Sequence, residues 1–203
     1  MMRLMHSPGA CSEGILLLLE EVDAPFEVEL IDLKSGAQNS VQFRQVNPKG
    51  KVPALQREDG SVLTEFTAIA FWLARRFPEA ELMGSSLEAQ ARTLELVDFI
   101  VASIHMRGFT FFKVPHKFSP TPDVQSAIAA HGRAAASAGL TLLSEHLGVQ
   151  DYLLGAFTIA DAAAWYVLRW AIADEMDLPE NLMQLYARIE KRRARNNKSI
   201  GNT

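Results

Sequence analysis

The stretch that decides the fold covers residues 3–33, "RLMHSPGACSEGILLLLEEVDAPFEVELIDL". Its first four residues, "RLMH", are a candidate for a short β-strand. A leucine-rich segment at residues 12–22 follows, with Glu20 and Glu21 expected to face outward, and this pattern indicates a helix. Apolar and polar residues then alternate through "FEVELIDL" at 26–33, which predicts a second strand. The stretch therefore predicts a βαβ unit.

A hairpin and a helix are expected next. The segments "KVPALQ" and "SVLT" flank "REDG", whose Asp59-Gly60 pair favours a tight turn between two strands. The segment "EFTAIAFWLARRF" carries apolar residues at helical spacing and stops at Pro78. Residues 1–80 are therefore expected to form an α/β domain, in which helices cover a small mixed sheet.

The composition changes beyond residues 78–87, where helical patterns replace strand patterns. They cover residues 87–106 and 123–147, and two more begin in "FTIADAAAWYVLRWA" and "ENLMQLYARIEKRRA". The alanine-rich "AIAAHGRAAASAG" indicates closely packed helices. We therefore expect an all-α domain at residues 87–203, which ends in a basic tail interpreted as a helix end and a solvated terminus.

Composition narrows the possible functions. The net charge of −4 and the pI near 5.7 argue against nucleic-acid binding through a global positive field. The apolar run at residues 15–19 is too short to span a membrane, so no membrane association is expected. A single cysteine forms no intramolecular disulfide, which favours a reducing, cytoplasmic location. The histidines show no metal-ligand spacing, and we assign no metal.

That single cysteine, Cys11, lies between the turn at Pro8 and Gly9 and the leucine-rich helix. A free cysteine is most often a small buried hydrophobic residue. A helix N-terminus, however, stabilises a thiolate through its unpaired N–H groups, so the thiol is also expected to be unusually acidic and accessible. Both interpretations, a packing residue and a reactive thiol, remain open from the sequence.

Five motifs in order, "SPGACS", "NPKGKVPAL", "LTEFTAIAFWLA", "FIVASIHMRGF" and "FTIADAAAWYVLRWA", resemble the bacterial beta class of glutathione transferases. The resemblance runs from residue 2 to about residue 190. It implies a thioredoxin-like N-terminal domain that binds glutathione as co-substrate, and an all-helical C-terminal domain that lines the pocket for a small hydrophobic electrophile. It also implies a homodimer that acts in detoxification.

The resemblance implies a glutathione site in the N-terminal domain. Pro53 is expected to be cis, so that the Val52 backbone faces the ligand like an added strand edge. Glu65 is expected to pair with the amino group of the γ-glutamyl arm at a helix start. The family usually has serine or glycine where this chain has Phe66, whose backbone N–H can still donate while its ring either lies near the ligand or turns into the core. From the residues alone, an ordinary trans proline at a strand start is favoured for Pro53, and a first-turn acid that complements the helix dipole is equally plausible for Glu65.

Asp98 and His105 are the candidates in the helical part. Seven residues separate them, which places both on one face of a helix with 3.6 residues per turn. A lone histidine is more often a structural residue, but the resemblance of "SIHMRGF" implies that His105 assists catalysis together with Cys11. The family often has lysine where this chain has Met106. Asp161, by contrast, has capping-box spacing with Thr158, and we predict a structural role for it.

The function implied is a glutathione transferase, which conjugates the glutathione thiolate to an electrophile. Two alternatives stay open. A mixed disulfide at Cys11 would make the chain a glutathione-dependent thiol-disulfide reductase. The fold also serves non-catalytic binding scaffolds, for which Phe66 and Met106 are the kind of departure one would expect.

Overall fold

The computed structural model describes residues 1–200, and the side chains up to residue 195. The chain divides into two compact units, Met1–Met83 together with the chain from Lys191 onward, and Gly84–Glu190. In order along the chain the elements are β1 (Met2–His6), α1 (Ser12–Glu21), β2 (Phe26–Leu30), η1 (Ala37–Asn39), α2 (Val41–Val46), β3 (Ala54–Gln56), β4 (Val62–Thr64), α3 (Phe66–Arg76), η2 (Pro78–Ala80), α4 (Leu87–Asp98), η3 (Phe99–Phe109), α5 (Thr110–Lys113), η4 (Pro115–Lys117), α6 (Pro122–Leu147), α7 (Ile159–Ala173) and α8 (Glu180–Ile200).

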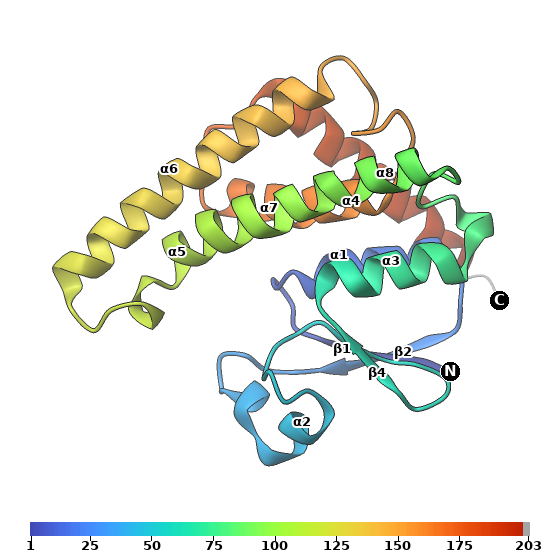
Figure 1. Ribbon diagram of the computed structural model, residues 1–203, viewed down its shortest axis with the longest axis horizontal. Helices are drawn as coiled ribbons and strands as arrows, with labels where there is room; N and C mark the ends of the chain where they lie inside the picture. The colour runs from blue at the N-terminus through green and yellow to red at the C-terminus, as the bar shows by residue number, and fades with distance from the viewer. Residues whose placement is uncertain (201–203) are drawn as a thin grey trace. The chain divides into compact units, whose positions relative to one another are not determined.

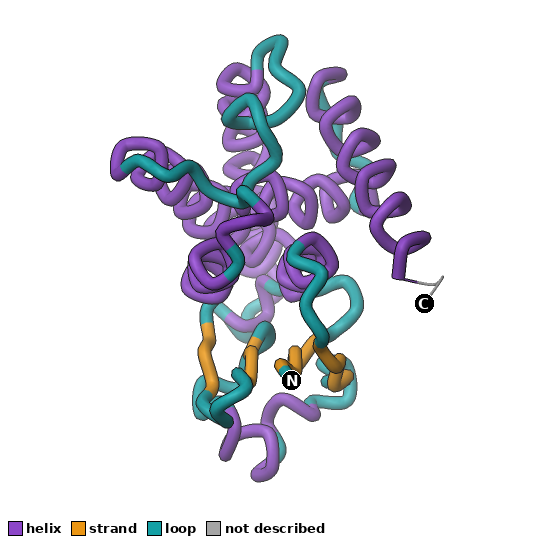
Figure 2. The backbone as a smooth tube through the Cα atoms, turned by 90° about the vertical axis from the view of Figure 1, so that its right-hand side faces the viewer, coloured by secondary structure: helices purple, strands orange, loops and turns teal. Residues whose placement is uncertain are grey.

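The first unit contains a four-stranded mixed sheet in the order β2-β1-β3-β4. The strands β1 and β2 are parallel, and the hairpin of β3 and β4 is antiparallel, as the sequence predicts. Helices α1 and α3 cover one face of this sheet and α2 lies on the other (Figure 1), and the strands appear together as orange segments in Figure 2. The leucine face of α1 and Leu4 and Leu55 of the sheet are fully buried, so the core lies between these layers.

The strand β2 differs from its prediction in one respect. Its alternating sequence predicts one buried and one solvated face, yet Val28 and Leu30 are both exposed. β2 is the edge strand of the sheet and pairs with β1 on one side only.

Glu20 and Glu21 were expected to face outward, and this prediction is wrong. Arg192 of α8 donates two hydrogen bonds of 2.8 Å to the Glu21 carboxylate, whose side chain is only 4% exposed. Arg193 binds Glu20 in the same two-pronged way at 2.7 and 2.9 Å. The basic segment is therefore not a solvated terminus at these two positions, since α8 continues through them and anchors itself on α1.

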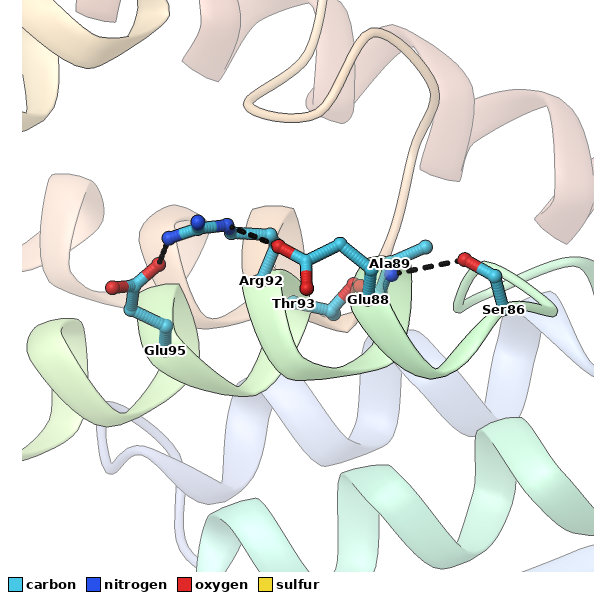
Figure 3. A network of polar contacts seen from close by, with 6 residues as sticks. All are labelled: Ser86, Glu88, Ala89, Arg92, Thr93 and Glu95. Carbon is cyan, nitrogen blue, oxygen red and sulfur yellow. Dashed lines mark hydrogen bonds and ion pairs between the residues drawn. The ribbon is translucent and has the colours of Figure 1, made fainter.

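In the second unit, the helix predicted at residues 87–106 changes its winding. It is an α-helix only through α4, and the following segment η3 is a π-helix, in which each N–H bonds to the carbonyl five residues earlier. Figure 3 shows the polar contacts that stabilise the α-helical part. Ser86 caps its start by accepting from the Ala89 N–H, and Arg92 bonds Glu88 and Glu95 at 3.0 and 2.9 Å.

The remaining helices agree with their predictions. α6 covers the predicted 123–147 segment, and close packing through small residues is confirmed, since a Cβ on Gly132 would lie 2.5 Å from the backbone nitrogen of Phe112. At the start of α7, Thr158 and Asp161 form the predicted capping box. Within the described residues, no helix is long and apolar enough to cross a membrane.

Candidate functional site

The turn between β1 and α1 holds Cys11 in a defined position. The Ser12 hydroxyl lies 2.9 Å from the His6 Nδ1 and accepts the Ser7 N–H at 3.2 Å. The Glu13 carboxylate accepts the Gly9 N–H at 2.8 Å, where the backbone has the positive φ of 79° that glycine tolerates. These bonds tie the turn to both flanking elements, so Cys11 is placed by buried polar contacts as well as by the helix it precedes.

Cys11 meets the loop before β3. Its thiol donates to the Val52 carbonyl oxygen at an Sγ–O distance of 3.7 Å. The Val52-Pro53 peptide bond is cis, as predicted, and both residues are buried. The structure thus brings together Cys11 and Val52, two residues 41 positions apart in the sequence.

The expectation of an acidic thiol is wrong. Cys11 as a residue is half-buried, but desolvation of its sulfur is the largest effect and raises the pKa from 9.0 to about 12. The backbone N–H groups of Cys11 and Ser12 act in the opposite direction, as a helix start should, and are outweighed. The nearby negative charge of Glu65 also raises this pKa. At neutral pH the side chain is therefore a neutral thiol that donates a hydrogen bond.

Glu65 lies at the N-cap of α3 with its carboxylate exposed. Its φ of 73° and ψ of 131° fall in the half of the backbone map that residues with a Cβ rarely adopt. The Lys49 Nζ lies 2.7 Å from Glu65 Oε1 and donates to the Thr64 hydroxyl at 2.9 Å. Unusual backbone conformations of this kind cost free energy and cluster at functional sites. The result is an exposed carboxylate with a lysine beside it, near the Cys11 thiol.

Phe66 follows Glu65 and is the first residue of α3. Its side chain is only 5% exposed, so the ring has turned into the core. Of the two possibilities for this ring, the structure therefore favours packing, and the position of Phe66 at the helix start still gives its backbone the first-turn geometry in which N–H groups point out of the helix.

The second unit holds the other two candidates, and the structure does not give them one environment. Asp98, the last residue of α4, is exposed, whereas His105 is half-buried in η3. The prediction of a shared face rests on 3.6 residues per turn, and the wider π-helical turns of η3 do not have that spacing.

His105 lies against aromatic residues of α7. Its Nδ1 is 3.2 Å from the Tyr166 hydroxyl, and its ring makes edge contacts with Tyr166 and Trp170 at centroid distances of 5.6 and 4.8 Å. Tyr166 was missed from the sequence, although it lies in the "FTIADAAAWYVLRWA" motif. Lys49 was missed as well, although it lies in the "NPKGKVPAL" motif itself.

Asp161 is structural, as predicted. Its carboxylate accepts the Leu153 N–H at 2.9 Å and the Thr158 N–H at 2.8 Å, and it is fully buried. Burial raises the Asp161 pKa from 3.8 to about 6, against the lowering effect of these hydrogen bonds. The described residues contain no cluster of histidine, cysteine and carboxylate groups that could hold a metal ion.

Comparisons with known proteins place the chain among glutathione S-transferases. Residues 9–76 match the family model "Glutathione S-transferase, N-terminal domain". The chain is 34% identical over 196 residues to "Glutathione S-transferase GstA" of Escherichia coli O157:H7, an alignment that covers 94% of this chain and 92% of that protein.

Solved structures show the same fold. A sphingomonad glutathione S-transferase complexed with glutathione is 30% identical, with a TM-score of 0.79 and coverage of 99% of this chain and 100% of that one. A bacterial beta class enzyme from Sphingomonas chungbukensis is 28% identical, with the same TM-score and coverage. The expected fold, a thioredoxin-like N-terminal domain followed by a helical region, is confirmed.

Proposed function

The chain belongs to the glutathione S-transferase family, and we propose that it conjugates the thiolate of glutathione to a small hydrophobic electrophile. One observation carries the proposal within the first unit. A neutral thiol at Cys11, the buried Val52-Pro53 turn and the exposed carboxylate of Glu65 lie together at the ends of α1, β3 and α3. These groups match three parts of glutathione, namely its sulfur, its peptide backbone and its amino group.

We propose that the Val52 backbone pairs with the cysteinyl part of glutathione, as one strand edge pairs with another. Glu65 would then bind the γ-glutamyl amino group, and the first turn of α3, including the Phe66 N–H, would bind its carboxylate. Asp98 stays a candidate contact on the grounds of the family resemblance. Lys49, already bonded to Glu65, holds that carboxylate in place before the ligand arrives.

Cys11 acts on the sulfur as a hydrogen-bond donor in this proposal. A free thiol has a pKa of about 8.5, so little of glutathione is ionised at pH 7, and donors around the sulfur increase the thiolate fraction. In the conjugation of an aryl halide the thiolate attacks the ring carbon, the carbon–sulfur bond forms, and halide leaves. The proton of the original thiol passes to solvent. His105 stays a candidate second donor on the grounds of the family resemblance.

The raised pKa of Cys11 favours transfer over the reductase alternative. Disulfide exchange needs a thiolate nucleophile, and a desolvated neutral thiol supplies very little of it at neutral pH. Hydrogen-bond donation needs the protonated form, which is the one that burial maintains. The observation therefore supports a donor role at Cys11.

The finer assignments are also proposals. The likeness to the beta class enzyme from Sphingomonas chungbukensis and the sequence resemblance to that class support the beta class. A two-fold homodimer is the commonest closed assembly and is our proposed state. A single cysteine and the absence of a disulfide requirement support the cytoplasm, where conjugation would serve detoxification.

Retention on immobilised glutathione, followed by an assay with chlorodinitrobenzene, tests the function. Retention with turnover supports the transferase. Retention without turnover would identify a binding scaffold, and loss of retention would remove the proposed glutathione site. Glu65→Ala is the matched variant for this test. It should abolish retention, because it removes the carboxylate proposed to bind glutathione and leaves Asp161 and the fold around Asp161 unchanged.

A further inference from the structure

Asn47 follows α2 and begins the loop that leads to Val52. Its side chain is buried, with 1% exposure, although asparagine is mostly a surface residue. The Asn47 Nδ2 donates to the Lys51 carbonyl at 2.7 Å, and the Asn47 Oδ1 accepts the Lys49 N–H at 3.2 Å. Since a carbonyl only accepts and a backbone N–H only donates, these partners leave the amide one orientation. The Asn47 side chain therefore holds the loop at two points.

Further contacts tie the same loop to α2 and η1. The Gly50 N–H donates to the Asn47 carbonyl at 2.9 Å, and Gly50 has a φ of 62°, which glycine adopts readily. The Arg44 guanidinium donates to the Pro48 carbonyl at 3.3 Å and to the Asn39 side-chain oxygen at 2.9 Å. The conformation of the loop is therefore set by contacts within the first unit.

The bond from Asn47 to Lys51 also sets the direction of the next N–H group. The peptide bond between Lys51 and Val52 is trans, so its C=O and its N–H point in opposite directions within one plane. The Lys51 carbonyl points toward the buried Asn47 amide. The Val52 N–H therefore points away from that amide, and no described residue accepts a hydrogen bond from it.

The Val52 carbonyl supplies the other half of this strand edge, and it already meets the Cys11 thiol at 3.7 Å. An extended ligand pairs with a strand edge through an N–H donor and a C=O acceptor. Rotation of the peptide between Lys51 and Val52 would turn the N–H inward and bring a second carbonyl to the edge in its place. The bond from the Asn47 amide opposes this rotation, because it engages the carbonyl that would have to move.

We propose that Asn47 is a positioning residue for glutathione, which holds the Lys51 carbonyl inward so that the Val52 N–H is presented to a carbonyl of the ligand's cysteinyl part. This inference rests on the proposed function, since it assumes that the Val52 backbone pairs with glutathione. Asn47 itself touches no substrate in this account. Its effect passes through one peptide group and acts on binding, not on the chemical step.

Asn47→Asp tests the proposal with almost no change in the shape of the side chain. A carboxylate keeps the acceptor for the Lys49 N–H but cannot donate to the Lys51 carbonyl, so the peptide loses the bond that orients it. We expect the Kd for glutathione, from calorimetric titration, to rise about tenfold, as for one lost hydrogen bond to the ligand. The kcat at saturating glutathione should stay within about twofold of the wild type.

Asn181→Asp is the matched control for a general loss of stability. Asn181 also uses its side-chain amide to hold backbone carbonyls, since its Nδ2 donates to Ser144 at 2.9 Å and to Gly148 at 3.1 Å within the second unit. This variant should lower the free energy of unfolding, as Asn47→Asp does, and should leave the Kd for glutathione as it is. An equal rise of Kd in both variants overturns the proposal, as does an unchanged Kd in Asn47→Asp.

Amide NMR of the wild type gives a readout that needs no variant. Saturating glutathione should slow the hydrogen exchange of the Val52 amide and move its proton resonance downfield. A Val52 amide that saturating glutathione leaves unchanged overturns the proposal. If the wild type binds no glutathione, the proposed function fails and this inference fails with it. If the wild type binds glutathione and Asn47→Asp binds it equally well, only the inference fails.

Discussion

The Cys11 sulfur and the Val52 carbonyl oxygen lie 3.7 Å apart, with the thiol as the donor. This contact joins the start of α1 to the turn before β3. The thiol uses its proton in this hydrogen bond, and a thiolate would have no proton to donate. The strand-edge backbone that we propose for glutathione binding is therefore in direct contact with the proposed donor to its sulfur. A ligand sulfur that approached this edge could replace the carbonyl as acceptor.

We predict that Cys11 stays protonated well above neutral pH. Its pKa of about 12 means that alkylation by iodoacetamide should be slow near pH 8 and should accelerate only at strongly alkaline pH. Oxidised glutathione should likewise form a mixed disulfide slowly. The rate of alkylation as a function of pH, followed by mass spectrometry, measures this. Half-maximal reactivity at or below the free value of about 8.5 would show that the thiol is activated after all.

Glu65→Ala should weaken glutathione binding far more than Asp161→Ala. The first change removes a charged hydrogen bond to the ligand, which is typically about 1.5 to 3 kcal/mol, whereas the second removes a helix cap remote from the proposed contacts. Calorimetric titration at a temperature where both variants are folded compares them. Lys49→Ala is the control, because it removes the ion pair that Glu65 makes in the free chain and keeps the Glu65 carboxylate. Equal affinities in the wild type and Glu65→Ala would remove this residue from the site.

Asp161 should make the stability depend on pH in a defined direction. Its folded-state pKa of about 6 exceeds the ordinary value of 3.8, so the folded chain binds the proton more tightly than the unfolded chain. This contribution to the free energy of unfolding is fully present below the ordinary pKa of 3.8 and is lost as the pH rises through the folded-state pKa of about 6. The change is about 3 kcal/mol.

Denaturant unfolding of the wild type and of Asp161→Asn, at about pH 4 and about pH 7, isolates this effect because asparagine does not titrate. The wild type should lose stability relative to the variant as the pH rises. A difference that is constant with pH, or that changes in the wild type's favour, would contradict the raised pKa.

The arginine pairs of α8 should stabilise the first unit. Arg192→Ala leaves the Glu21 carboxylate buried without its two-pronged partner, and we expect a loss of about 3 kcal/mol in the free energy of unfolding. Lys191→Ala, at an exposed neighbouring position, should change it by less than about 0.5 kcal/mol. Similar losses in both variants would show that the pair contributes nothing specific.

Local patterns were enough to predict most of the fold. The βαβ unit, the hairpin at Asp59-Gly60 and the Thr158 capping box each depend on residues close in sequence, so their signals are complete within a short window. Glu20 and Glu21 were misassigned because their partners lie more than 170 positions away on α8. The sequence also offered no sign that the helix carrying His105 changes to π-helical winding.

The candidate site was predictable in its members more than in its chemistry. The sequence motifs alone indicate three of its members, Cys11, Val52 and Glu65. The protonation of Cys11 was misjudged because a helix start favours a thiolate while burial opposes it, and the balance depends on the packing around the sulfur. Tyr166 lies 61 positions from His105, so their contact needed the three-dimensional structure.

The ionisation of bound glutathione tests the central claim most directly. The ultraviolet absorption of a thiolate, recorded as glutathione is added to the protein at pH 7, reports this ionisation, and Cys11 contributes no background because its own pKa is about 12. We predict a thiolate signal with the wild type, a reduced one with Cys11→Ser, which keeps a hydroxyl donor, and a smaller one still with Cys11→Ala. A saturated complex with no more thiolate than free glutathione at the same pH would contradict the account.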